Sequence, residues 1–257
     1  MEKLLERFNL FDLFTMLIPG IIITALAWIS LANPLSYYLS DMGNEKYLFF
    51  FVIAYFVGLI YQELGTIMDK VFLNKCLYGG PIREVFLSKE RNAQAKWKKF
   101  GNAEILSEPG FFEEVYKLKK DLSKEFMFEE SVAPDASAAE KESAEAASNS
   151  LFCGYCLDLC ERNNVHAKSE KISIISEMSR SLFWGCATVV ALNVILLFSN
   201  IFGAAWDMAL FYLIDAVLLS VAGLIMLKRK ARYEVYRLRI MLRAAMIYTK
   251  QHGSLLK

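Results

Sequence analysis

Apolar residues are concentrated in four blocks along the chain, and nearly all charged residues lie between or after these blocks. The blocks cover residues 10–31, 47–64, 182–202 and 206–227. Each is close to the ~20 residues that a helix needs to cross ~30 Å of hydrocarbon. The pattern predicts an all-α, polytopic membrane protein with four transmembrane helices in two hairpins.

The polar stretches divide the chain into four predicted parts. Residues 1–64 form an N-terminal transmembrane hairpin, and residues 65–180 form a helical cytoplasmic insertion between spans 2 and 3. Residues 181–227 form a C-terminal transmembrane hairpin, and residues 228–257 form a basic cytoplasmic tail. Within the insertion, residues 131–150 are dominated by Ala, Ser and Glu, so a flexible linker and a solvated helix both fit this segment.

The charges of the loops predict the orientation. Residues 32–46 hold one lysine and two acids, whereas residues 228–257 hold nine basic residues and one acid. By the positive-inside tendency, both termini and the insertion lie in the cytoplasm. The first block lacks a small-residue cleavage site after it, which favours a retained anchor over a secretory signal peptide.

The apolar run FYLIDAVLLSVAGLIML carries a carboxylate, Asp215, near its middle. A charge at mid-bilayer costs from ~3 to well above 10 kcal/mol, so such residues usually face protein or water. If spans 3 and 4 fold back about Ala204, Asp215 lies opposite Asn193, and the two can form a hydrogen bond. Thr24 and Tyr55 are predicted at a comparable depth, so we expect an intramembrane polar layer of these four side chains.

Three interpretations of this polar layer stay open. It stabilises the helices of one subunit, it specifies a homo-oligomer, or it lines a path for ions or protons. Pro19 and Gly20 interrupt the first block near its middle and predict a kink in that helix, which is either a hinge or a static bend.

The segment FCGYCLDLCERNNVH brings Cys153, Cys156, Cys160 and His166 close together in sequence, and thiolates with an imidazole can bind zinc. On one helix, however, the cysteines follow an i, i+3, i+7 stripe, and a rigid helix does not usually close three ligands around one metal. Burial against a neighbouring helix is therefore favoured, with metal binding and redox sensing as the alternatives. We predict no cofactor.

Motifs of hydrolytic and nucleotide-binding enzymes are not found in the sequence. Its only histidines are His166 and His252, and it has no G-x-S-x-G, H-E-x-x-H or phosphate-binding glycine loop. We therefore expect a protein that is not an enzyme. The insertion has nineteen acids against seventeen bases, and the whole chain has a formal charge of +1, so nucleic acid is not a favoured partner.

The tail combines basic and apolar residues, as amphipathic helices beside membranes do. We interpret the tail first as an anchor at anionic headgroups. The second interpretation is that the tail is a docking site for an acidic cytoplasmic partner or a phosphate ligand. The basic residues concerned are Lys228, Arg229, Lys230, Arg232, Arg239 and Arg243.

Three short segments, FNLFDLFTMLIPG, LGTIMDKVFLNKCLYGGP and SEMSRSLFW, resemble a set of uncharacterised bacterial inner-membrane proteins with four spans and a cytoplasmic helical insertion. The resemblance covers the spans and their flanks and does not extend to residues 131–150. Some members lie near anti-phage defence genes, so the resemblance implies the bacterial inner membrane and a role in antiviral defence. It is a likeness of fold and implies no catalytic residues.

These observations give one main hypothesis and two alternatives. The main hypothesis is a homo-oligomeric inner-membrane sensor or effector that senses or perturbs the bilayer in anti-phage defence. The alternatives are a membrane scaffold that recruits a cytoplasmic protein partner and a membrane-bound enzyme. The expected partners are the lipid bilayer, further copies of the chain and a cytoplasmic protein.

Overall fold

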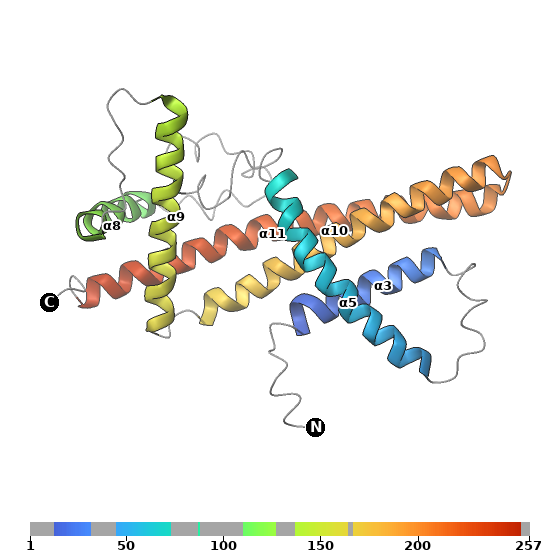
Figure 1. The fold of residues 1–257 in the computed structure, drawn as a ribbon, viewed down its shortest axis with the longest axis horizontal. Helices are drawn as coiled ribbons and strands as arrows, with labels where there is room; N and C mark the ends of the chain where they lie inside the picture. Colours follow the sequence, from blue (N-terminus) through green and yellow to red (C-terminus); the bar gives the residue numbers. More distant parts are fainter. Residues whose placement is uncertain are drawn as a thin grey trace. The chain divides into compact units, whose positions relative to one another are not determined.

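The computed structural model describes residues 13–31, 45–72, 87, 110–126, 137–163 and 167–252 (Figure 1). These residues are almost entirely helical and include no strand, which confirms the all-α prediction for the described ranges. In chain order the elements are the π-helical turn η1 (Leu13–Leu17), α3 (Ile18–Ser30), α5 (Glu45–Met68), α8 (Phe111–Phe126), α9 (Ala138–Arg162), α10 (Ala167–Phe202) and α11 (Trp206–His252).

The described residues fall into two units. The apolar unit comes from Met1–Asp69 and Ile174–Lys230, and the polar unit comes from Lys70–Ser173 and Ala231–Lys257. The boundaries between them lie just after α5, inside α10 and inside α11.

Three helical stretches of the described residues are long and apolar enough to cross a membrane. They are Tyr47–Phe72, Lys168–Phe202 and Trp206–Gln251. A further stretch, Phe14–Ser30, is apolar but shorter. These helices are consistent with location in a membrane.

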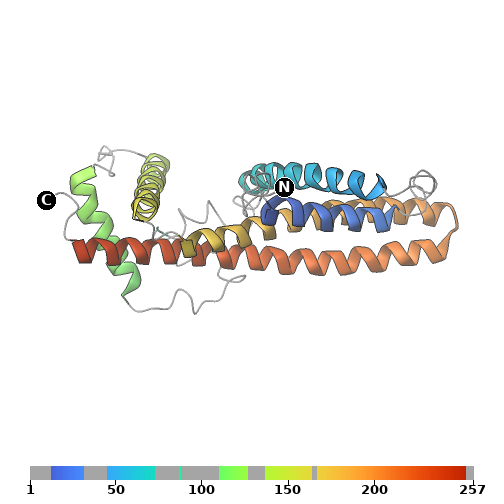
Figure 2. The same cartoon turned by 90° about the horizontal axis from the view of Figure 1, so that it is seen from below.

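Within the apolar unit, α10 and α11 lie side by side as an antiparallel hairpin in both views (Figures 1 and 2). The backbone N–H groups of Gly203 and Ala205 close the turn by donating to the carbonyl oxygens of Ser199 and Asn200, at 3.0 and 2.9 Å. Between them, Ala204 has a φ of 55°, in the left-handed region that residues other than glycine rarely adopt. The predicted hairpin with its turn at Ala204 is confirmed.

The first two apolar helices approach each other closely through glycine. A Cβ atom at Gly20 in α3 would overlap the carbonyl oxygen of Ala54 in α5. A Cβ atom at Gly58 in α5 would overlap the carbonyl oxygen of Met16 in η1. Without side chains at these positions, the two backbones can come into contact, as small residues allow at helix interfaces in membranes.

Pro19 lies in the first turn of α3, directly after the π-helical turn Leu13–Leu17. Proline has no N–H group to donate to the preceding turn, and it stands where the helical geometry changes from π to α. The kink predicted at Pro19 and Gly20 stays a prediction, and a change from π-helical to α-helical geometry lies directly before these residues. Gly20 itself is buried and serves the contact with α5.

The α10–α11 hairpin extends further than α3. The last residue of α3, Ser30, contacts Asp215 in α11, nine residues after that helix begins at Trp206. At ~1.5 Å of rise per residue, the hairpin continues for about 14 Å beyond the end of α3, as Figure 2 also shows. Large apolar side chains on this extension, including Phe198, Phe202 and Trp206, are exposed.

The polar unit is built from α8, α9 and the C-terminal part of α11, and α9 crosses that part of α11 in Figure 1. The amphipathic helix α8 buries Phe111, Val115 and Leu122, which share one face at helical spacing. The Lys119 ammonium group of α8 donates to the side-chain oxygen of Asn149 in α9 at 2.8 Å. This contact joins α8 to α9.

Residues 138–150 form the first half of α9. Ser137 caps the helix: its hydroxyl oxygen accepts from the Glu140 N–H at 3.3 Å, and the Glu140 carboxylate accepts from the Ser137 N–H at 2.8 Å. These two hydrogen bonds form a capping box. The Ser137 N–H and the Ser137 hydroxyl both donate to the Glu140 carboxylate and lower the pKa of that carboxyl. A flexible linker and a solvated helix are both predicted for residues 131–150, and residues 138–150 form a helix. Residues 131–136 lie outside the described residues.

Candidate intramembrane polar site

Asp215 contacts two other helices of the apolar unit. The Asn193 amide nitrogen in α10 donates to Asp215 Oδ2 at 2.5 Å, and the Ser30 hydroxyl in α3 donates to the same oxygen at 3.4 Å. The Tyr212 hydroxyl, nearly one turn before Asp215 in α11, donates to the backbone oxygen of Ser30 at 3.3 Å. The predicted hydrogen bond between Asn193 and Asp215 is confirmed. We call these four residues the Asp215 cluster.

Thr24 and Tyr55 do not contact Asp215 among the described residues. Because α3 ends at the level of Asp215, Thr24 lies nearly two turns away along α3. The Thr24 hydroxyl oxygen is buried without a hydrogen-bond partner in the described ranges. Tyr55 is half-buried in α5, with its ring 6.2 Å from that of Phe56. The predicted layer is therefore replaced by a cluster that includes Ser30, which the sequence places at the end of the first apolar block but not beside Asp215.

The groups around Asp215 favour a positive charge. The C-terminal carbonyl groups of a helix carry partial negative charge, and α3 ends at Ser30 beside the Asp215 carboxylate. Asn193 is fully buried, and its side-chain oxygen has no hydrogen-bond partner among the described residues. Within the same ranges, no cationic side chain pairs with Asp215. The cluster therefore offers oxygen atoms to a monovalent cation or to water.

A second group of polar side chains in the apolar unit is a buried ion pair. The Lys230 ammonium of α11 lies 2.5 Å from one oxygen of Asp69, and the Trp184 indole N–H of α10 donates to the other oxygen at 3.3 Å. Asp69 is 7% exposed and Lys230 is 4% exposed. We call these three residues the Asp69 cluster.

The Asp69 cluster corrects the interpretation of Lys230. The sequence places Lys230 in a basic tail that faces headgroups or a partner, but the structure buries its side chain against Asp69. Asp69 follows the second apolar block directly. Charged residues at the ends of spans are ordinarily expected to contact headgroups. The sequence pattern therefore does not predict that Asp69 and Lys230 pair with each other.

The other basic residues of the tail remain near the surface of α11. Lys228, Arg229, Arg232 and Arg243 are exposed, and Arg239 is half-buried. The Arg239 guanidinium group lies 5.8 Å from the centre of the Phe111 ring, within the range of a cation–π contact. The headgroup and partner interpretations of these residues stay predictions.

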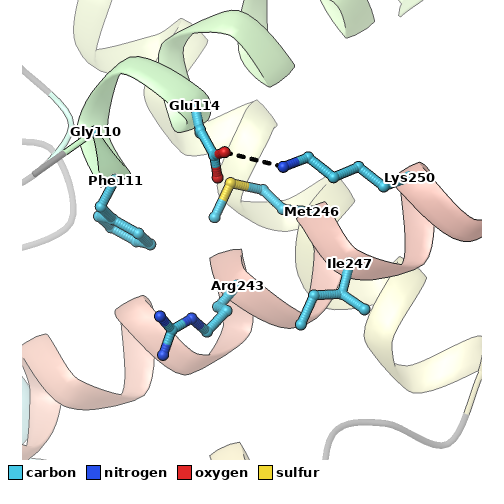
Figure 3. Close-up of a pocket in the computed structure, with 7 residues that line it drawn as sticks. All are labelled: Gly110, Phe111, Glu114, Arg243, Met246, Ile247 and Lys250. Atoms are coloured by element: carbon cyan, nitrogen blue, oxygen red, sulfur yellow. Dashed lines mark hydrogen bonds and ion pairs between the residues drawn. The ribbon is translucent and has the colours of Figure 1, made fainter. Parts of the chain in front are cut away.

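Two clefts flank the C-terminal part of α11 in the polar unit. The first has a volume of about 360 Å³ and is lined by Gly110, Phe111, Glu114, Arg243, Met246, Ile247 and Lys250 (Figure 3). The second has a volume of about 440 Å³ and is lined by Lys168, Tyr236, Arg239, Ile240, Arg243, Ala244 and Ile247. Arg243 and Ile247 line both clefts and therefore lie between them.

Cys153, Cys156 and Cys160 are buried in α9 and do not form disulfides. The Cys160 sulfur lies 3.6 Å from the backbone oxygen of Met241 in α11. Burial raises the pKa of the Cys156 thiol well above its usual range and also raises that of Cys160, so both are neutral at physiological pH. The interpretation of this stripe as apolar side chains against a neighbouring helix is confirmed. His166 lies outside the described residues.

No protein-family model, curated protein or solved structure matches the chain.

Proposed function

We propose that the chain is a four-span, homo-oligomeric protein of the bacterial inner membrane. It acts as a sensor or effector, in which protons or monovalent cations bind at Asp215 or pass it. The stretch Phe14–Ser30, with the residues beside it, supplies the fourth span. Both termini and residues 65–180 lie in the cytoplasm.

The observation that carries this proposal is the incomplete pairing of the Asp215 cluster. A polar network that serves packing alone is expected to be fully hydrogen-bonded, because an unsatisfied buried group costs ~1–3 kcal/mol. Here Asn193 keeps a buried oxygen without a partner among the described residues, next to a carboxylate that no cation of those ranges neutralises. Such a site supports uptake of a proton, cation or water.

Self-association follows from the position of Asp215 on the unit's surface. Asp215 is half-buried, while its neighbours Leu213, Ile214 and Val217 are exposed apolar side chains. In lipid, the exposed part of a carboxylate must meet water or another protein surface. A second copy of the chain can supply that surface. Native mass spectrometry from detergent should give more than one subunit, and a monomer in every detergent that keeps the protein folded contradicts this part.

Ion flux through purified protein tests the proposal directly. The full chain is reconstituted in liposomes, and potassium, sodium and proton flux are followed with dyes and as current in planar bilayers. We expect flux in the wild type and a loss of about tenfold or more in Asp215→Asn, because the variant removes the charge that attracts cations to the site. Asp207→Asn is the matched control, because Asp207 is an exposed residue in the first turn of the same helix.

Two outcomes reject the conducting form of the proposal. One is the absence of flux in the wild type at every voltage, pH and membrane tension tested. The other is equal flux in the wild type and Asp215→Asn. If purified oligomers are folded but carry no flux, the scaffold alternative is favoured, since the basic clefts beside α11 are suited to a partner.

The role in anti-phage defence rests on the resemblance of the span-flanking segments to bacterial inner-membrane proteins found near defence genes. Expression of the wild-type chain in a phage-sensitive bacterium should reduce plaque formation. Expression of the Asp215→Asn variant should leave plaque formation at the level of cells without the protein. Protection that is retained in Asp215→Asn separates the defence role from the intramembrane site.

A further inference from the structure

The two clefts beside α11 carry an uneven charge. Of the described residues that line them, four carry cationic side chains and one, Glu114, carries a carboxylate. The cations are Lys168, Arg239, Arg243 and Lys250. Complementary charge steers encounter and selects partners, so these clefts favour a negatively charged occupant.

The surface between the charges is apolar. Ile247 is 50% exposed and lines both clefts together with Arg243, while Met246 lines the first cleft and Ile240 the second. A large exposed apolar side chain between hollows is typical of a binding groove. The occupant should therefore present apolar side chains as well as carboxylates.

The Glu114 carboxylate of the first cleft is paired with a cation of the same cleft. Figure 3 shows Glu114 and Lys250 pointing toward each other, with their charged atoms 3.0 Å apart. Both side chains are more than half exposed, and exposed pairs of this kind contribute little to stability. A stronger competitor can displace Glu114 from Lys250 at low cost. Arg243 lies apart from this pair in the same view.

We propose that the clefts dock an acidic amphipathic helix of a cytoplasmic partner protein. Its apolar side chains enter the hollows on either side of Ile247, and its carboxylates pair with Arg243, Arg239 and Lys250. This is the helix-in-groove mode of recognition, which needs a concave apolar surface with charged rims. The exposed apolar side chain of Ile247 between the hollows favours a protein helix, which can present apolar side chains and carboxylates together, over anionic headgroups, which match the cations alone. The site is separate from Asp215 and does not depend on ion passage.

A synthetic peptide provides the test. The full chain in phosphatidylcholine nanodiscs is titrated with a fluorescein-labelled helical peptide that has leucines at i, i+3, i+4 and i+7 and glutamates elsewhere. We expect saturable binding that weakens with salt, and no binding of the same peptide with lysines in place of the glutamates. Arg243→Glu should weaken binding by about tenfold or more, because it places like charges together.

Two further variants test whether a change in peptide affinity comes from the clefts, from the overall basic charge of α11 or from misfolding. Arg232→Glu makes the same change at an exposed arginine of α11 that lines neither cleft, and it should leave affinity unchanged. Glu114→Gln removes the competing carboxylate and should strengthen peptide binding by about two- to fivefold, as loss of an exposed ion pair permits. A gain of affinity cannot arise from a protein that fails to fold.

Three outcomes overturn the proposal. The first is no saturable binding of the acidic peptide. The second is equal weakening by Arg243→Glu and Arg232→Glu, which shows general attraction to a basic helix. The third is that the nanodiscs float with phosphatidylglycerol vesicles, that this flotation is lost in Arg243→Glu, and that the peptide does not bind. This result would assign the surface to a membrane.

Discussion

The apolar unit contains two aspartates in polar clusters, and their surroundings differ. Asp69 is buried with Lys230 at one oxygen and the Trp184 indole at the other. Asp215 is half-buried and receives hydrogen bonds from Asn193 and Ser30, without a cationic partner among the described residues. The first carboxylate is neutralised in place, and the second is not.

This difference separates stability from activity within one unit. A buried ion pair is costly to break, because removal of one partner leaves the other charge in a poorly solvating environment. A carboxylate with neutral neighbours and an unpartnered amide oxygen nearby is available for exchange with water or cations. We therefore expect the same substitution, aspartate to asparagine, to unfold the Asp69 cluster and to inactivate the Asp215 cluster.

Asp69→Asn should give the largest loss of stability. It leaves Lys230 facing a neutral amide, and breaking a buried pair in this way costs about 3–5 kcal/mol. The free energy of unfolding is measured in detergent by titration with SDS, followed by circular dichroism. A loss as small as that of the exposed control Asp207→Asn would show that another group compensates the charge of Lys230.

Trp184→Phe should have an intermediate effect. It keeps most of the aromatic ring but removes the N–H that donates to Asp69, and a hydrogen bond to a charged group contributes ~1.5–3 kcal/mol. At 3.3 Å we expect the lower end of this range. Trp206→Phe is the matched control, because Trp206 is 66% exposed at the start of α11. Equal melting temperatures of the two variants would remove Trp184 from the Asp69 cluster.

Asp215→Asn should change the free energy of unfolding by no more than ~1 kcal/mol, because an amide at this position still accepts from Asn193 and can also donate to its free oxygen. The same SDS titration measures this change. A loss of stability as large as that of Asp69→Asn would mean that Asp215 serves packing, and the comparison between the two clusters would fail.

The contact between Asn193 and Asp215 was predictable because the turn between α10 and α11 is short. A turn at residues 203–205 leaves little freedom in how the two helices align, so positions equally far from Ala204 lie opposite each other. The same reasoning finds the core contacts between Val189 and Leu219.

The remaining contacts join helices whose connections are long. Residues 32–44 separate α3 from α5, and residues 70–173 separate Asp69 from the second segment of the apolar unit, Ile174–Lys230. Such connections set no register, so the sequence pattern cannot indicate that Ser30 meets Asp215 or that Asp69 meets Lys230. The assumption that all four apolar helices share one depth placed Thr24 in the layer, whereas α3 in fact ends at that level.

Thr24→Val should have the smallest effect and the opposite sign. The Thr24 hydroxyl is buried without a partner in the described ranges, and valine has nearly the same shape without the polar atom. Its removal should therefore stabilise the protein by up to ~1 kcal/mol. Thr188→Val in α10 is the matched control, because the exposed Thr188 hydroxyl donates to the backbone oxygen of Trp184 at 3.1 Å and gains nothing from removal.

Flux through Thr24→Val then decides what an unpartnered buried oxygen means in this unit. If Thr24 is only a packing defect, stability rises and flux stays at the wild-type level, which leaves the exchange of ions to the Asp215 cluster. If flux falls while stability rises, the Thr24 hydroxyl belongs to the path, and that path runs along α3 for nearly two turns beyond Ser30. Liposome flux and SDS titration on the same preparation distinguish these two results.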